Sequence, residues 1–145
     1  TLDKKSHSLI SESALNDKKV TLAKPQTFMN NSGSSVSALT KNYKLKTKNL
    51  VVVHDDIDIP LGKIKVSVGR GSAGHKGVDS IIQALRTKNF TRIRVGIQQN
   101  KGKPKNVDAF VLQKFPSKEL RSLNQTISEA RDALLTLGAK KRPTN

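Results

Sequence analysis

Three aspartates and a histidine are crowded directly after a run of apolar, mostly β-branched residues. Residues 50–53 (LVVV) predict a strand buried on both faces, and residues 54–60 (HDDIDIP) follow it. In open α/β sheets, ligands and catalytic groups collect at the carboxyl ends of strands, where acids can orient a histidine, bind a cation or receive a proton. The alternative is a polar turn in which aspartate side chains bond to their own backbone before Pro60. This segment alone leaves both interpretations open.

A glycine-rich stretch at residues 69–77 (GRGSAGHKG) forms a second candidate site. It opens a helical pattern, so its backbone N–H groups can approach a phosphate or another anion. The spacing matches neither the Walker pattern nor a dinucleotide-binding fingerprint, which disfavours a nucleotide-binding module. The polar side chains of Arg70, His75 and Lys76 favour a ligand, whereas the alternative is a tight strand-to-helix connection that uses glycine for positive φ.

Asn30 lies in a third polar segment, the loop at residues 24–33 (KPQTFMNNSG). Its amide offers two donors and an acceptor, and can hold a peptide carbonyl or a water molecule. The alternative for an asparagine at this place is the N-cap of the helix that follows.

The charge of the chain points to an anionic partner. Its 145 residues include 27 Lys and Arg against 11 Asp and Glu, which gives a formal net charge of +16. No segment approaches the roughly 20 apolar residues that span a bilayer, so we expect nucleic acid and no membrane partner. Because only 3% of the residues are aromatic, recognition should depend on phosphates more than on stacked bases.

Cysteine is absent, and the three histidines lack a zinc-binding spacing, so we expect no metal site. The chain begins at Thr1 and has no signal-peptide pattern. We therefore expect a cytoplasmic protein, and a sequence that has lost its natural start.

Alternating strand and helix patterns predict an α/β fold: a single domain over residues 1–145, with a mixed, mostly parallel twisted sheet flanked by helices. Turn residues Asn16 and Asp17 join a predicted hairpin, and residues 139–145 form a basic tail. Strands are expected near 49–54, 63–68 and 91–97, and helices near 34–43, 78–85 and 117–137. For the last helix we expect Ser117 as the cap, Gly138 at its end, and an apolar stripe made of Leu120, Leu123, Ile127, Ala130, Leu134 and Leu137.

Four segments, taken in order, resemble the bacterial-type peptidyl-tRNA hydrolase family. They are residues 24–33 and 71–77, together with 53–63 (VHDDIDIPLGK) and 90–97 (FTRIRVGI), and the resemblance runs from about Leu9 to Gly138. It implies a monomeric α/β domain that hydrolyses the ester joining a peptide to the 3′ end of tRNA, with no metal or cofactor. The partner would be peptidyl-tRNA, for which the basic composition is suited.

The resemblance also implies roles for single residues. Asp55 would be catalytic, as the carboxylate that orients and polarises a histidine base. Substrate would be bound by Phe28, Asn30, His75 and Lys76. Lys76 stands where the family has asparagine, and an ammonium group can donate to a carbonyl but cannot accept. Lys65 and Arg94 would contact tRNA phosphates, and the alternative for each is a solvated charge on a strand.

The chain departs from the family pattern at its beginning. The family starts with a strand, a Gly-Asn-Pro-Gly-type turn and a helix with Thr-Arg-His-Asn, which supplies the catalytic histidine. None of these occurs here, and neither His7 nor His54 matches that motif. We therefore expect an N-terminally incomplete copy that is inactive alone. The alternative function is that of a non-catalytic tRNA- or RNA-binding relative of the same family.

Overall fold

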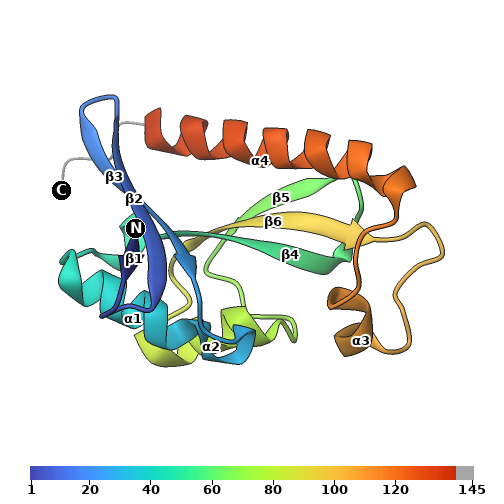
Figure 1. Ribbon diagram of the computed structural model, residues 1–145, viewed down its shortest axis with the longest axis horizontal. Coiled ribbons are helices and arrows are strands. Elements are labelled where there is room, and N and C mark those ends of the chain that lie inside the picture. The colour runs from blue at the N-terminus through green and yellow to red at the C-terminus, as the bar shows by residue number, and fades with distance from the viewer. Residues whose placement is uncertain (140–145) are drawn as a thin grey trace. The chain divides into compact units, whose positions relative to one another are not determined.

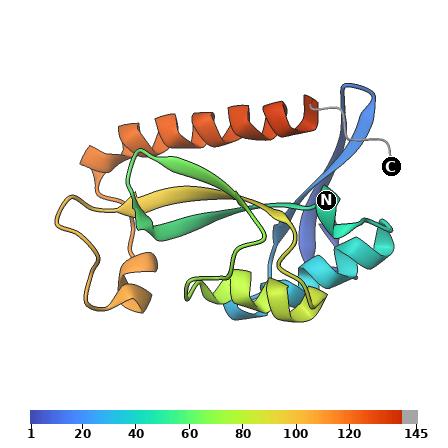
Figure 2. The ribbon, with the colours of Figure 1, turned by 180° about the vertical axis from the view of Figure 1, so that it is seen from behind.

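The computed structural model describes residues 1–139, so the predicted basic tail lies, from residue 140 on, outside the described residues. The chain forms two compact units, which are described separately. Of the described residues, the first unit comprises 1–51, 68–91 and 138–139, and the second comprises 52–67 and 92–137. Figures 1 and 2 show their elements from opposite sides.

An antiparallel sheet occupies the start of the first unit. Its strands β1 (Leu2–Asp3), β2 (Ser8–Leu15) and β3 (Lys18–Pro25) are paired in that order. Asn16 and Asp17 connect β2 to β3 with φ values of 50° and 63°. A two-residue turn with positive φ at both positions matches the right-handed twist of the strands, which is why Asn and Asp suit it. The predicted hairpin is confirmed.

Two helices complete the first unit and pack against each other. A 3-10 turn, η1 (Met29–Asn31), leads into α1 (Ser32–Asn42), and α2 (Lys76–Leu85) follows the glycine-rich stretch. Gly33 lies so close to α2 that a Cβ atom there would be 2.1 Å from the carbonyl oxygen of Ser80. Its N–H also donates to Ser80 Oγ at 2.9 Å. Apolar side chains of both helices are buried, among them Val36, Leu39, Val78 and Ile81. Another 3-10 turn, η2 (Thr47–Asn49), follows α1.

A second sheet carries the acidic segment. Its strands β4 (Val51–Pro60), β6 (Thr91–Gln98) and β5 (Ile64–Val68) lie in the order β4-β6-β5. Backbone hydrogen bonds join Thr91 to Leu50 and Leu61 to Gln98, so β4 and β6 run parallel. The strand predicted to end at His54 therefore continues to Pro60, and the acidic residues lie within it rather than after it.

A long helix covers the second sheet. The short helix α3 (Val107–Val111) and the 3-10 turn η3 (Ser117–Glu119) precede α4 (Leu120–Ala139), which runs alongside the strands in both views (Figures 1 and 2). Two positions of the predicted stripe are wrong, because Leu120 is 44% exposed and Ile127 is 51% exposed, whereas Thr126 is buried. Ser117 begins the 3-10 turn and makes no cap, and Gly138 lies inside α4 rather than at its end.

The predicted mixed α/β class is confirmed, with two three-stranded sheets in place of one continuous sheet. Parallel pairing joins β4 and β6, whereas β1, β2 and β3 pair antiparallel. Four α-helices accompany the strands among residues 1–139.

The contact between α1 and α2 yields a stability prediction. Helix propensity alone would make Gly33→Ala stabilising by at most about 1 kcal/mol. The added methyl would instead meet backbone atoms of Ser80 that cannot rotate away, and overpacking of this kind costs about 1–3 kcal/mol. We expect urea unfolding to show net destabilisation. Gly71→Ala is the matched control, because nothing lies within 4 Å of a Cβ atom there. An unfolding midpoint at or above wild type for Gly33→Ala would contradict the packing described.

Candidate functional site

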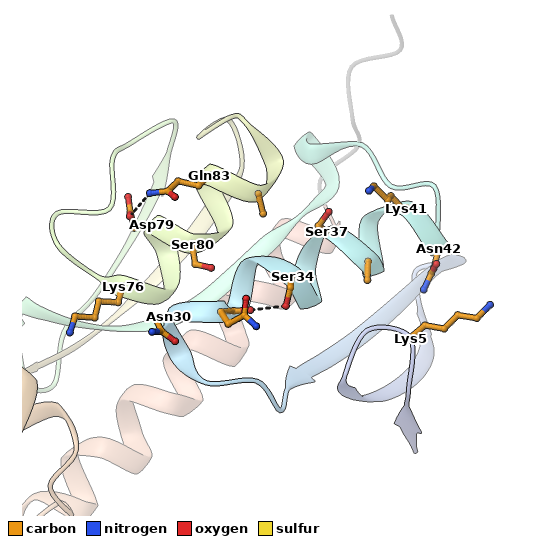
Figure 3. Close-up of a pocket in the computed structure, with 13 residues that line it drawn as sticks. Lys5, Asn30, Ser34, Ser37, Lys41, Asn42, Lys76, Asp79, Ser80 and Gln83 are labelled. Carbon is orange, nitrogen blue, oxygen red and sulfur yellow. Dashed lines mark hydrogen bonds between the residues drawn. The ribbon is translucent and has the colours of Figure 1, made fainter.

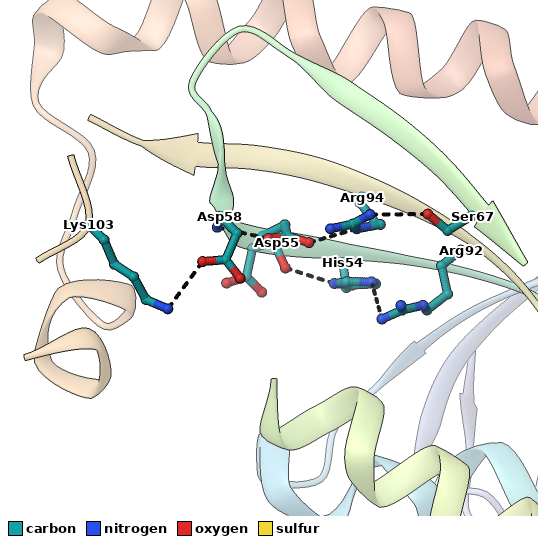
Figure 4. Close-up of polar contacts among 8 residues, drawn as sticks. His54, Asp55, Asp58, Ser67, Arg92, Arg94 and Lys103 are labelled. Carbon is teal, nitrogen blue, oxygen red and sulfur yellow. Dashed lines mark hydrogen bonds and ion pairs between the residues drawn. The ribbon is translucent and has the colours of Figure 1, made fainter. Parts of the chain in front are cut away.

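The acidic stretch of β4 combines a local turn-like bond with a buried ion pair, both made by Asp56. Its Oδ1 accepts the backbone N–H of Asp58 at 2.8 Å, the kind of bond expected of a polar turn. Its Oδ2 accepts from Arg94 Nε, also at 2.8 Å, with side-chain exposures of 11% for Arg94 and 10% for Asp56. Arg94 Nη1 donates further to Ser67 Oγ on β5, at 3.2 Å (Figure 4).

The side chain of Arg92 is buried one step away on the same strand. Only 4% of this residue is exposed, and its Nη1 lies 3.4 Å from His54 Nε2 (Figure 4). His54 Nδ1 is 2.7 Å from the carbonyl oxygen of Asp55. A guanidinium can only donate and a carbonyl can only accept, so the ring must donate from Nδ1 and accept at Nε2. In this arrangement both ring nitrogens of His54 are engaged by the fold.

These contacts determine how Asp56 titrates. Burial raises the pKa of Asp56, but the hydrogen bond from Arg94, the backbone bond from Asp58 and the nearby positive charges together outweigh it. The pKa of this carboxyl therefore lies below its ordinary value. Asp56 is ionised near neutral pH, and it neutralises a cation that the fold has removed from water.

The residues predicted to act in β4 and its neighbours differ in their exposure. Asp55 is half-buried in β4 between His54 and Asp56, and its catalytic role stays a prediction (Figure 4). Lys65 is exposed on β5, in keeping with the phosphate contact predicted for it. Arg94 is committed to Asp56 and Ser67, so the geometry favours a structural role for it over the predicted phosphate contact. Asp58 is bound at the exposed end of the strand by Lys103, at 3.1 Å.

The predicted substrate-binding residues of the first unit surround the beginnings of its two helices. Asn30 is exposed in η1, and the N-cap position of α1 falls to Asn31, which makes no side-chain cap bond. Within residues 1–139 we find no hydrogen bond to the Asn30 side chain, so the helix-cap alternative for it is wrong. Phe28 is 87% exposed beside it. His75 caps α2, because its Nδ1 accepts the N–H of Val78 at 3.1 Å.

A polar groove between α1 and α2 joins two of these residues. It has a volume of about 900 Å³, and all of its lining residues belong to the first unit. Asn30 and Lys76 lie at one end, and Lys5, Lys41 and Asn42 at the other (Figure 3). We call it the α1–α2 groove. Its lining combines amides, hydroxyls and ammonium groups with the methyl groups of Ala38 and Ala84, and Asp79 is the single carboxylate.

Sequence reasoning missed the paired side chains of β4 and β6. His54 and Asp56 are two residues apart, as are Arg92 and Arg94, and both contacts span 38 residues. Two polar residues at the same spacing in two strands would have predicted a ladder between parallel neighbours.

Comparison with known proteins decides the family. A sequence profile described as Peptidyl-tRNA hydrolase matches residues 1–144. The peptidyl-tRNA hydrolase of Thermodesulfovibrio yellowstonii is 42% identical over 130 residues, which cover 88% of this chain and 68% of that protein. The enzyme of the same name from Aquifex aeolicus is 44% identical over 113 residues, covering 78% and 58%. A crystal structure of peptidyl-tRNA hydrolase from Acinetobacter baumannii superposes with a TM-score of 0.78 at 28% identity, covering 96% of this chain and 76% of that one.

The chain belongs to the peptidyl-tRNA hydrolase family. It spans 58% to 68% of the length of the two curated relatives named above. The resemblance drawn from the four sequence segments is thereby confirmed at the level of the family.

Two kinds of feature are absent from the described residues. Among residues 1–139, no group of three or more His, Cys, Asp or Glu side chains is arranged to hold a metal ion. No helix in the same part of the chain is both long and apolar enough to cross a membrane.

The buried pair predicts how stability depends on pH in this peptidyl-tRNA hydrolase family member. Because the folded pKa of Asp56 is lowered, its stabilisation is present above the unfolded value of about 3.9 and is lost as pH falls through the folded pKa. We expect Asp56→Asn to remove part of this acid sensitivity. At neutral pH it should cost about 3 kcal/mol, because Arg94 keeps a buried charge without its counterion.

The measurement is urea unfolding from pH 7 to pH 2. Asp58→Asn is the control, since its exposed pair with Lys103 is worth at most about 1 kcal/mol. Equal neutral-pH stability for Asp56→Asn and wild type would show that the pair contributes nothing.

Proposed function

We propose that this chain acts in the hydrolysis of peptidyl-tRNA, releasing the peptide from the 3′ end of tRNA so that the tRNA returns to translation. The observation that carries the proposal is the family match over residues 1–144, together with relatives of this name at 42% and 44% identity. The net charge of +16 supports a polyanionic substrate. The predicted cytoplasmic location and monomeric state belong to the same proposal.

The reaction needs a base, a carbonyl-polarising donor and a protonated leaving group. Water adds to the ester carbonyl as a base removes its proton, and the tetrahedral intermediate then breaks its bond to the ribose oxygen. That oxygen takes up a proton, leaving a peptide carboxylate and a tRNA hydroxyl. In this proposal the Asp55 carboxylate orients and stabilises the imidazolium that forms, and Asn30 holds the water or the carbonyl. Lys76 donates to a carbonyl where the family resemblance expects asparagine.

The imidazole base of this scheme has no match among the three histidines of the chain. No Thr-Arg-His-Asn motif occurs in residues 1–145. His54 uses both ring nitrogens in contacts with Asp55 and Arg92, and His75 uses Nδ1 to cap α2. Lys76, in place of the asparagine that the resemblance expects, favours a second candidate function, that of a relative which binds tRNA or another RNA without cleaving it.

The first prediction from this proposal concerns salt. Because the chain is rich in lysine and poor in aromatic residues, its binding to tRNA should depend on the release of counterions from the phosphates. A plot of log K against log salt concentration should then have a slope of about −0.9 for each duplex phosphate contacted. We expect tRNA affinity to fall by at least about tenfold between roughly 50 and 200 mM salt. Lys65→Ala should lower the magnitude of the slope by about one contact, measured by filter binding. A nearly constant affinity across this range would contradict electrostatic recognition.

A second prediction separates the two candidate functions. The 145-residue chain should bind tRNA and cleave peptidyl-tRNA no faster than background, because a carboxylate is a much weaker base for water than an imidazole. Joining the N-terminal segment of the Thermodesulfovibrio relative should produce hydrolysis. In that active form, Asp55→Asn should lower kcat far more than it raises KM, since the carboxylate acts on charge that develops in the transition state.

Asp58→Asn in the same strand serves as the control, because Asp58 is bound to Lys103 at the exposed end of β4. Enzyme-like cleavage by the 145-residue chain itself would overturn this assignment of roles, and His75→Ala would then test for a different base. Failure of the joined form to hydrolyse, with tRNA binding intact, would favour the non-catalytic relative.

A further inference from the structure

We propose that the α1–α2 groove binds the peptide portion of peptidyl-tRNA in an extended conformation, and that its far end favours acidic peptide side chains. The proposal rests on the function proposed above and names the part of the substrate that this groove takes. One end of the groove carries Asn30 and Lys76, which the family resemblance assigns to substrate binding. The other end carries Lys5 and Lys41, for which the proposed reaction has no use.

The chemistry of the lining suits a peptide better than a nucleic acid. A peptide offers one N–H donor and one carbonyl acceptor at most residues, whereas a phosphodiester offers acceptors alone. The amides of Asn30, Asn42 and Gln83 both donate and accept. Asp79 would repel a phosphate, but it can accept a peptide N–H in addition to the bond it receives from Gln83 at 2.8 Å. The lining includes no aromatic ring on which a base could stack.

The length of the groove determines how much peptide it can hold. It follows α1, whose 11 residues extend over about 16 Å at roughly 1.5 Å per residue. An extended chain advances about 3.3 Å per residue, so about five peptide residues fit between the two ends. The volume of about 900 Å³ lies within the range of ordinary ligand pockets.

The charges give the groove a polarity. With the ester near Asn30 and Lys76, the fifth residue of the peptide would lie beside Lys5 and Lys41, both of which are exposed. Exposed ion pairs are worth up to about 1 kcal/mol each, which corresponds to a factor of about five. An acidic fifth residue should therefore bind about fivefold more tightly than a lysine at the same place.

The test uses a probe that the reaction cannot cleave. Acetylated pentapeptides are joined by an amide to 3′-amino-3′-deoxyadenosine, with Glu, Ala or Lys at the residue farthest from the nucleoside. Each is titrated into the 145-residue chain, and affinities are taken from amide NMR shifts of Ser37 and Gln83, which line the groove. We expect the probe with Glu to bind most tightly, the probe with Ala less tightly and the probe with Lys most weakly. Lys5→Glu combined with Lys41→Glu should reverse this order of affinities.

The control is Lys46→Glu combined with Lys48→Glu, which changes the net charge equally outside the lining of the groove. It should preserve the order of the three probes. Circular dichroism establishes that both double variants fold.

Each contrary result has a distinct meaning. If Lys5→Glu with Lys41→Glu leaves the order unchanged, or if a CCA trinucleotide without peptide shifts the same amides, the groove is not a peptide site. Those results leave the proposed function standing when tRNA binding persists. If tRNA fails to bind while the peptide order is retained, the proposed function is wrong and the peptide groove remains.

Discussion

Two buried guanidinium groups impose the main constraint on the second unit. Arg92 and Arg94 lie on one strand, and a charge withdrawn from water is tolerated only where hydrogen-bonding partners replace the solvent. The partners come from the adjacent strand, where Asp56 supplies a carboxylate and His54 a ring nitrogen. The strand register, the tautomer of His54 and the lowered pKa of Asp56 all follow from this requirement.

The requirement also specifies how β4 and β6 pair. The two contacts share the spacing of 38 residues, so both form in a single register. A slip by one residue would turn both arginines to the opposite face of the sheet and remove their partners. In hydrophobic strands without such contacts, side-chain packing selects the register. Here a mispaired register would also bury the charges of Arg92 and Arg94 without partners, which is electrostatically unfavourable.

The sequence carried enough local information to predict most elements of the fold. The β2–β3 hairpin was predictable because Asn16 and Asp17 tolerate the positive φ that the turn requires. The end of β4 was not, because aspartates and Pro60 normally mark a turn, and here contacts with β6 override that preference. The buried face of α4 was partly wrong, since Thr126 faces inward and closes its own hydrogen bond to the carbonyl oxygen of Ser122.

For the candidate site, the residue types in the sequence pointed to candidate residues, but the contacts that those residues make could not be predicted. The pattern of four segments identified the family, and it selected Asn30 and Lys76, which do line one groove. It also selected Arg94, whose donors are engaged by Asp56 and Ser67. The local sequence around an arginine on a strand does not tell whether its side chain faces solvent or a carboxylate. For Arg94 the carboxylate belongs to Asp56, which lies 38 residues away in the sequence.

Gly33 allows α1 and α2 to approach each other closely, and so affects the spacing of the two helices beside the groove. At Gly33 the main chain of α1 lies against Ser80 of α2 with no room for a Cβ atom, and among the residues that line the groove only Ser80 takes part in this contact. Lining residues such as Ser34, Ser37 and Gln83 can therefore be exchanged without changing the spacing of the two helices. Selection can act on what the groove recognises while its dimensions stay constant, and mutations that alter preference need carry no cost in packing.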